Sequence, residues 1–207
     1  MYIPKYFEVT DVNEIQDFIQ MNSFGTLVTT EQGKPIATHL PLMLNKQGDD
    51  YYITGHMAYA NPGWKTFEDE HENVLVIFQG PHAYVSSTWY KNENVPTWNY
   101  QAVHVYGTAS IMSEQELEED LKLLLQKYEH HRKNGALWEN LSPQTKKQIK
   151  GIVGFKIKVQ EIQAANKLSQ NRSEEDYHNI VNKLSEEKDL NSQQMAQLME
   201  RELKKNK

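Results

Sequence analysis

The pattern of apolar and polar residues predicts a chain that begins with short strands joined by tight turns. Strands are expected at residues 24–30, 35–44 and 51–54, with turns at Gln32-Gly33 and Gly48-Asp49 between them. Three successive strands of this kind are typical of an antiparallel meander, the start of a barrel or a sandwich. Residues 73–79 are almost continuously apolar, which predicts a central strand buried on both faces. Alternation over residues 152–162 predicts the last strand.

Helix-start signals stand between and after these strands. Asp11 with Glu14 three residues later predicts a short helix, and Ser113 with Glu116 forms a capping box before a longer one. Ser142 followed by proline begins another short helix, and one more short helix is expected to run through residue 67. Two amphipathic helices follow residue 173, and we expect their apolar stripes to pack either on the sheet or on a second subunit. These stripes are formed by Tyr177, Ile180, Val181, Leu184, Met195, Leu198, Met199 and Leu203.

The stretch from residue 80 to residue 107 combines aromatic rings with polar side chains. It contains His82, Tyr84, Trp89 and Trp98 among serines, threonines and asparagines. Such a mixture can stack a planar ligand and form hydrogen bonds with its edge, so we interpret the stretch as the wall of a binding site. The alternative is that these aromatic residues belong to an ordinary core. Strand alternation places Val103 and Val105 on one, apolar face and their neighbours on a mixed face.

Several uncommon residues recur here in the order seen in a known family. Gly80-Pro81-His82-Ala83-Tyr84-Val85-Ser86, Trp89-Tyr90 and Val95-Pro96-Thr97-Trp98-Asn99-Tyr100 resemble the PaiB family of transcriptional regulators, within the FMN-binding split-barrel superfamily. The resemblance extends to Gly55-His56-Met57-Ala58, Ala60-Asn61-Pro62 and Lys167-Leu168-Ser169-Gln170-Asn171-Arg172. Ser87 departs from the pattern, since we expect proline there. The resemblance covers most of the chain.

The resemblance implies a fold, a cofactor and an assembly. The fold is mainly β with peripheral helices (α+β), an antiparallel Greek-key split barrel of the FMN-binding type. We expect a split-barrel domain over residues 1–166 with inserted helices, and a helical extension over residues 167–207. The cofactor is FMN, held by a homodimer. The function implied is negative regulation of sporulation and protease genes.

The resemblance also suggests candidate cofactor-binding residues. Split-barrel flavoproteins such as pyridoxamine phosphate oxidase carry a basic phosphate-binding turn where residues 59–65 stand, so Lys65 is the best candidate for the FMN phosphate. A lysine that simply faces solvent is the alternative. Thr38 and His39 lie on the strand that runs beneath the flavin, although His39 can equally be an ordinary strand residue. The motif at residues 167–172 closes over the flavin region in the resembling families and is otherwise an inter-element loop. The full candidate set is Thr38, His39, His56, Asn61, Trp64, Lys65, His82, Trp89, Trp98, Lys167, Gln170, Asn171 and Arg172.

Composition narrows the remaining possibilities. The chain has 207 residues and no cysteine, which rules out disulfides, thiol catalysis and cysteine-ligated metal. His56, His82 and His104 match no metal-ligand spacing, so no metal is expected. No apolar run approaches the roughly 20 residues that span a bilayer, and no signal peptide is evident, so we expect a cytoplasmic protein without membrane contact.

The net charge of −6 affects the expected partners. DNA binding depends on neutralising phosphates with lysine and arginine, yet residues 167–207 carry eight positive and eight negative charges. Direct DNA binding is therefore open, and indirect regulation is the alternative. Two other functions stay as alternatives, an FMN-dependent oxidoreductase or flavin reductase and a haem-binding split-barrel protein. No catalytic residue is assigned, because the site is an aromatic cleft and contains no paired titratable groups.

Overall fold

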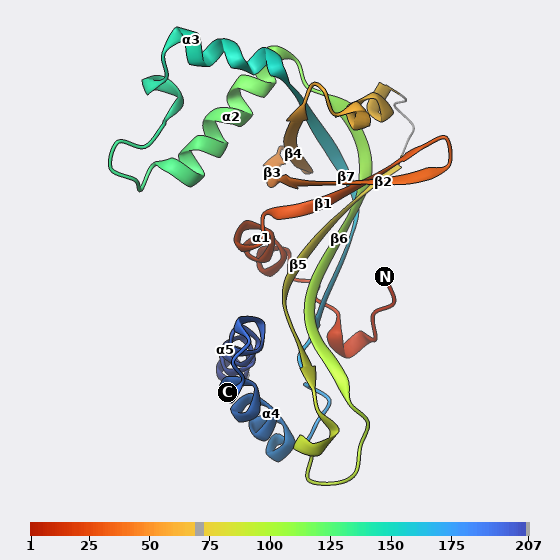
Figure 1. The fold of residues 1–207 in the computed structure, drawn as a ribbon. Coiled ribbons are helices and arrows are strands. Elements are labelled where there is room, and N and C mark those ends of the chain that lie inside the picture. The colour runs from red at the N-terminus through yellow and green to blue at the C-terminus, as the bar shows by residue number, and fades with distance from the viewer. Residues whose placement is uncertain (69–72, 206–207) are drawn as a thin grey trace. The chain divides into compact units, whose positions relative to one another are not determined.

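A single seven-stranded sheet forms the framework of the protein. The computed structural model describes residues 1–68 and 73–205. The strand order is β2-β1-β5-β6-β7-β4-β3 (Figure 1), and neighbouring strands with a defined register pair antiparallel. The expectation of a mainly β fold with peripheral helices is confirmed. The strands are β1 (Phe24–Glu31), β2 (Lys34–Pro41), β3 (Met43–Gln47), β4 (Asp50–Ala58), β5 (Asn73–Val85), β6 (Thr97–Ile111) and β7 (Ile152–Lys167).

The helices begin at the predicted capping residues. Asp11 Oδ1 accepts a hydrogen bond from the N–H of Asn13 at 2.8 Å, and the hydroxyls of Ser113, Ser142 and Ser173 each accept one from a backbone N–H three residues later. The α-helices are α1 (Val12–Met21), α2 (Glu114–Glu129), α3 (Pro143–Lys146), α4 (Glu174–Glu186) and α5 (Leu190–Lys205). The 3-10 helices are η1 (Lys5–Phe7), η2 (Pro62–Glu68), η3 (Ser87–Trp89), η4 (Trp138–Asn140) and η5 (Lys147–Gly151).

The chain divides into two compact units, and neither is a continuous segment. The first unit contains residues 1–18, 79–103 and 163–207, and the second contains residues 19–78 and 104–162. Strands β5, β6 and β7 each supply residues to both units. We describe the units separately. The predicted division into residues 1–166 and 167–207 stays a prediction.

The second unit is built on two antiparallel hairpins. Strands β1 and β2 pair from Phe24 opposite Pro41 to Glu31 opposite Lys34. Between them, Gln32 and Gly33 have φ values of 50° and 80°, which are the positive angles that a two-residue type I′ hairpin turn requires. Strands β3 and β4 form the second hairpin around Gly48, whose φ is 62°.

Two strand boundaries in this unit differ from the sequence-based prediction. The expected strand at residues 35–44 is divided at Leu42, which is fully buried and whose N–H donates to the carbonyl of Ser23 at 2.8 Å. Strand β4 continues through Gly55 to Ala58, in register with β7. Gly55 fits there because a side chain would collide with Leu42 and Phe155: an added Cβ would lie 2.7 Å from the Leu42 side chain.

Close backbone contact also fixes the pairing of two long strands. An added Cβ at Gly107 on β6 would lie 2.1 Å from the carbonyl oxygen of Lys158 on β7. Only glycine permits this approach. The core around it contains fully buried side chains from several strands. Val103 and Val105, which were predicted to share an apolar face of β6, are both buried. The largest fully buried members of the core are Leu27, Leu42, Ile53, Val76, Phe78, Phe155 and Ile157.

The first unit contains a helical cluster formed by α4 and α5, which lie side by side (Figure 1). The predicted stripes of both helices face inward, and Ile180, Leu184, Met195 and Met199 are fully buried. They pack with Ala83, Val85 and Tyr90, so the stripes are covered within the same chain. Strand β5 therefore reaches Val85 and is longer than the predicted 73–79, while β7 continues to Lys167, beyond the predicted 162.

Asn99 joins this cluster to the sheet. The side chain of Asn99 on β6 is fully buried, and its Nδ2 points to the sulfur of Met199 at 3.5 Å. Its Oδ1 accepts a hydrogen bond from the hydroxyl of Ser169 at 3.0 Å. Ser169 has a φ of 61°, so the loop that carries it is held in an unusual backbone conformation by a buried polar contact.

Among the described helices, none combines the length and apolar composition needed to cross a membrane.

Candidate functional site

The thirteen predicted cofactor-binding residues are distributed over both units. The second unit holds Thr38, His39, His56, Asn61, Trp64 and Lys65, and the first holds His82, Trp89, Trp98, Lys167, Gln170, Asn171 and Arg172. Each group is described within its own unit. The assignment of these residues to a cofactor stays a prediction.

Thr38 and His39 lie on β2, at the edge of the sheet. Strand alternation turns them to opposite faces, so Thr38 is half-buried and His39 is exposed. The ring of His39 stacks near that of Phe24, with centroids 6.4 Å apart. Phe24 is also exposed, so these two rings form an accessible aromatic pair on the hairpin.

The turn that leads to Lys65 is held by its own side chains. Asn61 Oδ1 accepts a hydrogen bond from the N–H of Gly63 at 2.9 Å, which forms an Asx-type turn. The indole N–H of Trp64 donates to the carbonyl of Tyr59 at 2.9 Å. The ammonium of exposed Lys65 lies 5.9 Å from the centre of the Trp64 ring. Asn61 and Trp64 therefore shape the turn, and Lys65 presents a positive charge to solvent.

In the first unit, three aromatic side chains from β5 and β6 gather on one surface. The Trp98 ring lies 6.2 Å from that of His82 and 5.9 Å from that of Tyr84, between centroids. Trp98 is 53% exposed and Tyr84 47% exposed. Rings this accessible are not core residues. The Trp98 ring is tilted 34° from that of His82 and 67° from that of Tyr84, so a planar ligand can stack on one ring and meet the edge of another.

Trp89 has a different environment from Trp98. It is half-buried and packs against the cluster formed by α4 and α5, and its carbonyl accepts a hydrogen bond from Asn179. It lies in η3, where the Ser86 hydroxyl accepts a hydrogen bond from the N–H of Thr88. This cap accounts for the turn at Ser87 without the proline of the family pattern.

Lys167 and Arg172 place two positive charges at the ends of one loop. The ammonium of half-buried Lys167 donates to the hydroxyl of Thr97 at 2.5 Å. Burial, and then the charge of Arg172, lower the pKa of Lys167. The Arg172 guanidinium lies over the Tyr90 ring, 4.7 Å from its centroid. Both cationic side chains can donate charge-assisted hydrogen bonds to an anionic group.

The residues between these cations hold the loop together. Gln170 Oε1 accepts a hydrogen bond from the N–H of Leu168 at 2.7 Å, and its Nε2 donates to the carbonyl of Asn166 at 2.6 Å. Asn171 is exposed. Gln170 is thus engaged within the loop, and Lys167 and Arg172 are the residues of this motif best suited to an anionic group.

These features fit FMN, which combines a planar ring system with a phosphate. The exposed rings around Trp98 can stack against a flat heterocycle, and the partly desolvated cations Lys167 and Arg172 suit an anionic group. The hydroxyl of Tyr90, beneath Arg172, is buried and has no hydrogen-bond partner among the described residues. A buried hydroxyl without a partner, on a ring that contacts Arg172, is consistent with a ligand that completes the site.

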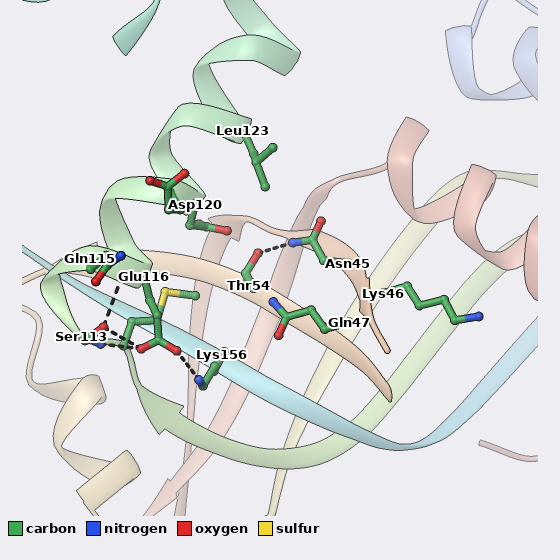
Figure 2. Close-up of a pocket in the computed structure, with 12 residues that line it drawn as sticks. Asn45, Lys46, Gln47, Thr54, Ser113, Gln115, Glu116, Asp120, Leu123 and Lys156 are labelled. Atoms are coloured by element: carbon green, nitrogen blue, oxygen red, sulfur yellow. Dashed lines mark hydrogen bonds and ion pairs between the residues drawn. The ribbon is translucent and has the colours of Figure 1, made fainter. Parts of the chain in front are cut away.

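The second unit also contains a pocket that sequence reasoning missed. It has a volume of about 400 Å³ and is lined by residues of β3, β4, β7 and α2 (Figure 2). Asp120 of α2 and Thr54 of β4 are buried in its wall. The Thr54 hydroxyl donates to the Asp120 carboxylate and accepts a hydrogen bond from Asn45 Nδ2 at 2.9 Å.

His56, one of the predicted residues, lies close to Asp120. Burial lowers the pKa of His56, although the negative charge of Asp120 acts in the opposite direction. Burial likewise raises the pKa of Asp120, against the Thr54 hydrogen bond and the influence of His56. Among the described residues, no group of three or more His, Cys, Asp or Glu side chains is arranged to hold a metal ion.

Asp120 could have been found from the helical pattern. It stands three residues after Leu117 and four before Leu124, on the stripe that faces inward. A carboxylate on a buried stripe is uncommon and indicates either a partner or a ligand. The sequence-based prediction of this helix did not include Asp120 as a site residue.

The sequence of this chain is similar to a family model and to known proteins. Residues 1–161 match the family model described as "Putative FMN-binding domain". The chain is 65% identical over 206 residues to "Protease synthase and sporulation protein PAI 2" of Bacillus subtilis, covering 99% of both chains. It is 26% identical over 223 residues to an uncharacterised protein of Emericella nidulans, covering 87% of this chain and 89% of that one.

Solved structures share the fold at low sequence identity. The flavocytochrome Anf3 of Azotobacter vinelandii superposes with a TM-score of 0.63 at 17% identity, covering 86% of this chain and 78% of that one. The conserved hypothetical protein Rv2991 of Mycobacterium tuberculosis gives a TM-score of 0.57 at 15% identity, covering 84% and 94%. The split-barrel class expected from the sequence is confirmed, and the family model supports FMN as the cofactor.

Proposed function

Because this chain belongs to the PaiB family of FMN-binding split-barrel proteins, we propose that it is an FMN-binding negative regulator of protease and sporulation genes. The observation that carries the proposal is the near-full-length similarity to the Bacillus subtilis sporulation protein. In this proposal the protein acts as a cytoplasmic homodimer, and FMN is the ligand through which it senses the state of the cell.

Each unit holds its own candidate residues for binding FMN. Lys65 contributes positive charge for the phosphate, and Thr38 is a further donor on the edge strand. Trp98, with His82 and Tyr84, offers the ring surface. Lys167 and Arg172 supply cations that can neutralise an anionic part of the ligand. When bound, FMN supplies redox chemistry, and the protein supplies orientation and charge.

An absorption spectrum before and after addition of FMN tests the proposal. We expect the flavin bands to shift on binding, and Lys65→Ala to weaken binding by at least about tenfold, because a charge-assisted hydrogen bond contributes roughly 1.5–3 kcal/mol. Lys150→Ala, which removes an exposed lysine of η5 in the same unit, is the matched control. Equal affinity in the Lys65 variant and the control would remove Lys65 from the phosphate site.

The same sample distinguishes the alternative functions. Rapid bleaching of bound flavin by NADH or NADPH, with turnover of an acceptor, would identify an oxidoreductase. A Soret band in the purified protein would identify haem binding instead. Light scattering at several concentrations tests the homodimer, for which we expect twice the mass of the 24.2 kDa chain.

Regulation is proposed to be indirect or to need a partner, because the net charge is −6. A protein that binds DNA directly should show affinity that falls steeply with salt, since each neutralised phosphate releases counterions. A gel-shift series with promoters of protease and sporulation genes, at several salt concentrations, tests this point. Tight, salt-sensitive binding would establish a direct repressor.

A further inference from the structure

Asp120 is a buried carboxylate in the wall of a pocket, and among the described residues no lysine or arginine forms an ion pair with it. The exposed fraction of Asp120 is 5%. Within the described part of the chain, its contacts are the hydroxyl of Thr54 and the nearby imidazole of His56. Buried charges in proteins are normally paired with an opposite charge, so this carboxylate lacks its usual compensation.

The cations around the pocket are engaged elsewhere. Lys156 of β7 forms an ion pair with Glu116 of α2. Lys122 bridges Glu118 and Glu119 at 3.0 and 2.8 Å. Lys46 of β3 is exposed, and its ammonium lies 5.7 Å from the centre of the Tyr51 ring. Burial keeps the pKa of His56 low, which favours the neutral imidazole near neutral pH.

Two apolar side chains in an otherwise polar lining can contact a short hydrocarbon chain. Met112 and Leu123 contribute apolar surface, and Leu123 is 54% exposed although it lies beside a pocket. Figure 2 shows Asp120 and Leu123 projecting from α2, with Thr54 and Asn45 across from them. The other two carboxylates of the lining, Glu116 and Glu119, pair with Lys156 and Lys122, which leaves Asp120 as the carboxylate without a paired lysine among the described lining residues.

We propose that this pocket binds a small aliphatic ammonium ion, with its charged group against Asp120 and its methylene groups against Met112 and Leu123. The carboxylate and the side-chain oxygens beside it accept hydrogen bonds from the ammonium group. The apolar side chains cover the hydrocarbon. The test of this site does not require the flavin.

Titration of n-butylammonium chloride into the full-length protein tests the proposal. Calorimetry and amide chemical shifts should show saturable binding with a Kd on the order of 1 mM, as expected for so small a ligand. The largest shifts should fall on Thr54, Asp120 and their neighbours. Asp120→Asn, which keeps the shape of the side chain and removes the charge, should weaken binding at least tenfold.

Matched controls separate the charge interaction from general effects. Asp50→Asn removes an exposed carboxylate that pairs with Lys158 and should change affinity less than twofold. Neutral n-butanol and anionic butyrate should not bind at the same concentrations. Circular dichroism of the Asp120→Asn protein checks that it is folded. Equal binding of n-butylammonium to the Asp120→Asn protein, equal binding of n-butanol, or no binding to the unmodified protein would each overturn the proposal.

Discussion

The guanidinium of Arg172 lies over the ring of Tyr90, 4.7 Å from the ring centroid. This contact joins the loop after β7 to a residue of the helical cluster, because Tyr90 packs with α4 and α5. We expect Arg172→Ala to lower the free energy of unfolding by about 1 kcal/mol, the usual contribution of a partly desolvated cation–π contact. Urea denaturation measures this. Arg201→Ala, at an exposed position of α5, is the control and should have little effect.

The capping box at the start of α2 gives a prediction about pH. Glu116 accepts a hydrogen bond from the N–H of Ser113 at 2.8 Å and pairs with Lys156. The Lys156 ammonium, and then Ser113, lower the pKa of Glu116 to about 2 from 4.5. A lowered pKa means that the ionised form stabilises the fold, fully above pH 4.5 and less as the pH falls toward 2.

Replacing Glu116 with glutamine should therefore reduce stability most at neutral pH. We expect Glu116→Gln to lower the free energy of unfolding by about 0.5–1 kcal/mol at pH 7, a modest value because the side chain is partly exposed. The difference from the unmodified protein should shrink at pH 3. Denaturation curves at both pH values measure it, with Glu114→Gln in the same helical turn as control. A difference that is equal at both pH values would contradict the assignment.

The close approach of β6 and β7 predicts a strong effect at one glycine. Gly107→Ala would place a Cβ 2.1 Å from the carbonyl oxygen of Lys158, so the strands must separate. We expect a loss of about 3 kcal/mol or more, the range of severe overpacking. Gly151→Ala is matched, because an added Cβ there meets nothing within 4 Å. Thermal unfolding of the two variants should differ clearly, and similar melting temperatures would show that the strands adjust.

For Asp120 we expect a contribution to the free energy of unfolding that depends on pH in the opposite sense to that of Glu116. Burial raises the pKa of Asp120 above the ordinary value of 3.8, so the folded chain holds this proton more tightly than the unfolded chain. Stability is then lost as the pH rises from 3.8 through the folded pKa. Asp120→Asn cannot ionise, and its stability relative to the unmodified protein should rise between pH 3.5 and pH 7. Denaturation without added amine measures this, and a constant difference would mean that Asp120 titrates normally.

Sequence reasoning located the elements whose signals are local. The hydroxyls of Ser113 and Ser173 cap helices as predicted, because a cap is read from residues within one helical turn. The break at Leu42 was missed, since it depends on a hydrogen bond to Ser23 from a distant part of the chain. The extension of β4 through Gly55 was missed for a similar reason, because its support comes from packing against Leu42 and Phe155.

In the candidate site, too, features with a local sequence signal could be predicted, and features that depend on distant contacts could not. The aromatic surface was visible because Tyr84 and Trp98 stand in an unusual stretch of sequence, and the structure leaves both rings accessible. The pocket at Asp120 was not visible, because it requires a helix, two hairpin strands and β7 to meet. Which of the predicted residues contact FMN depends on the arrangement of subunits and ligand, so that assignment stays a prediction.

The helical cluster has a practical consequence for the expression of fragments. The match to the family model ends at residue 161, inside β7. A truncation designed on that match would cut the strand and remove α4 and α5, which cover Ala83, Val85 and Tyr90. The shortened chain would expose this apolar surface to water, and we expect it to precipitate or to be degraded. Fragments expressed for biochemical work should therefore retain the chain through α5.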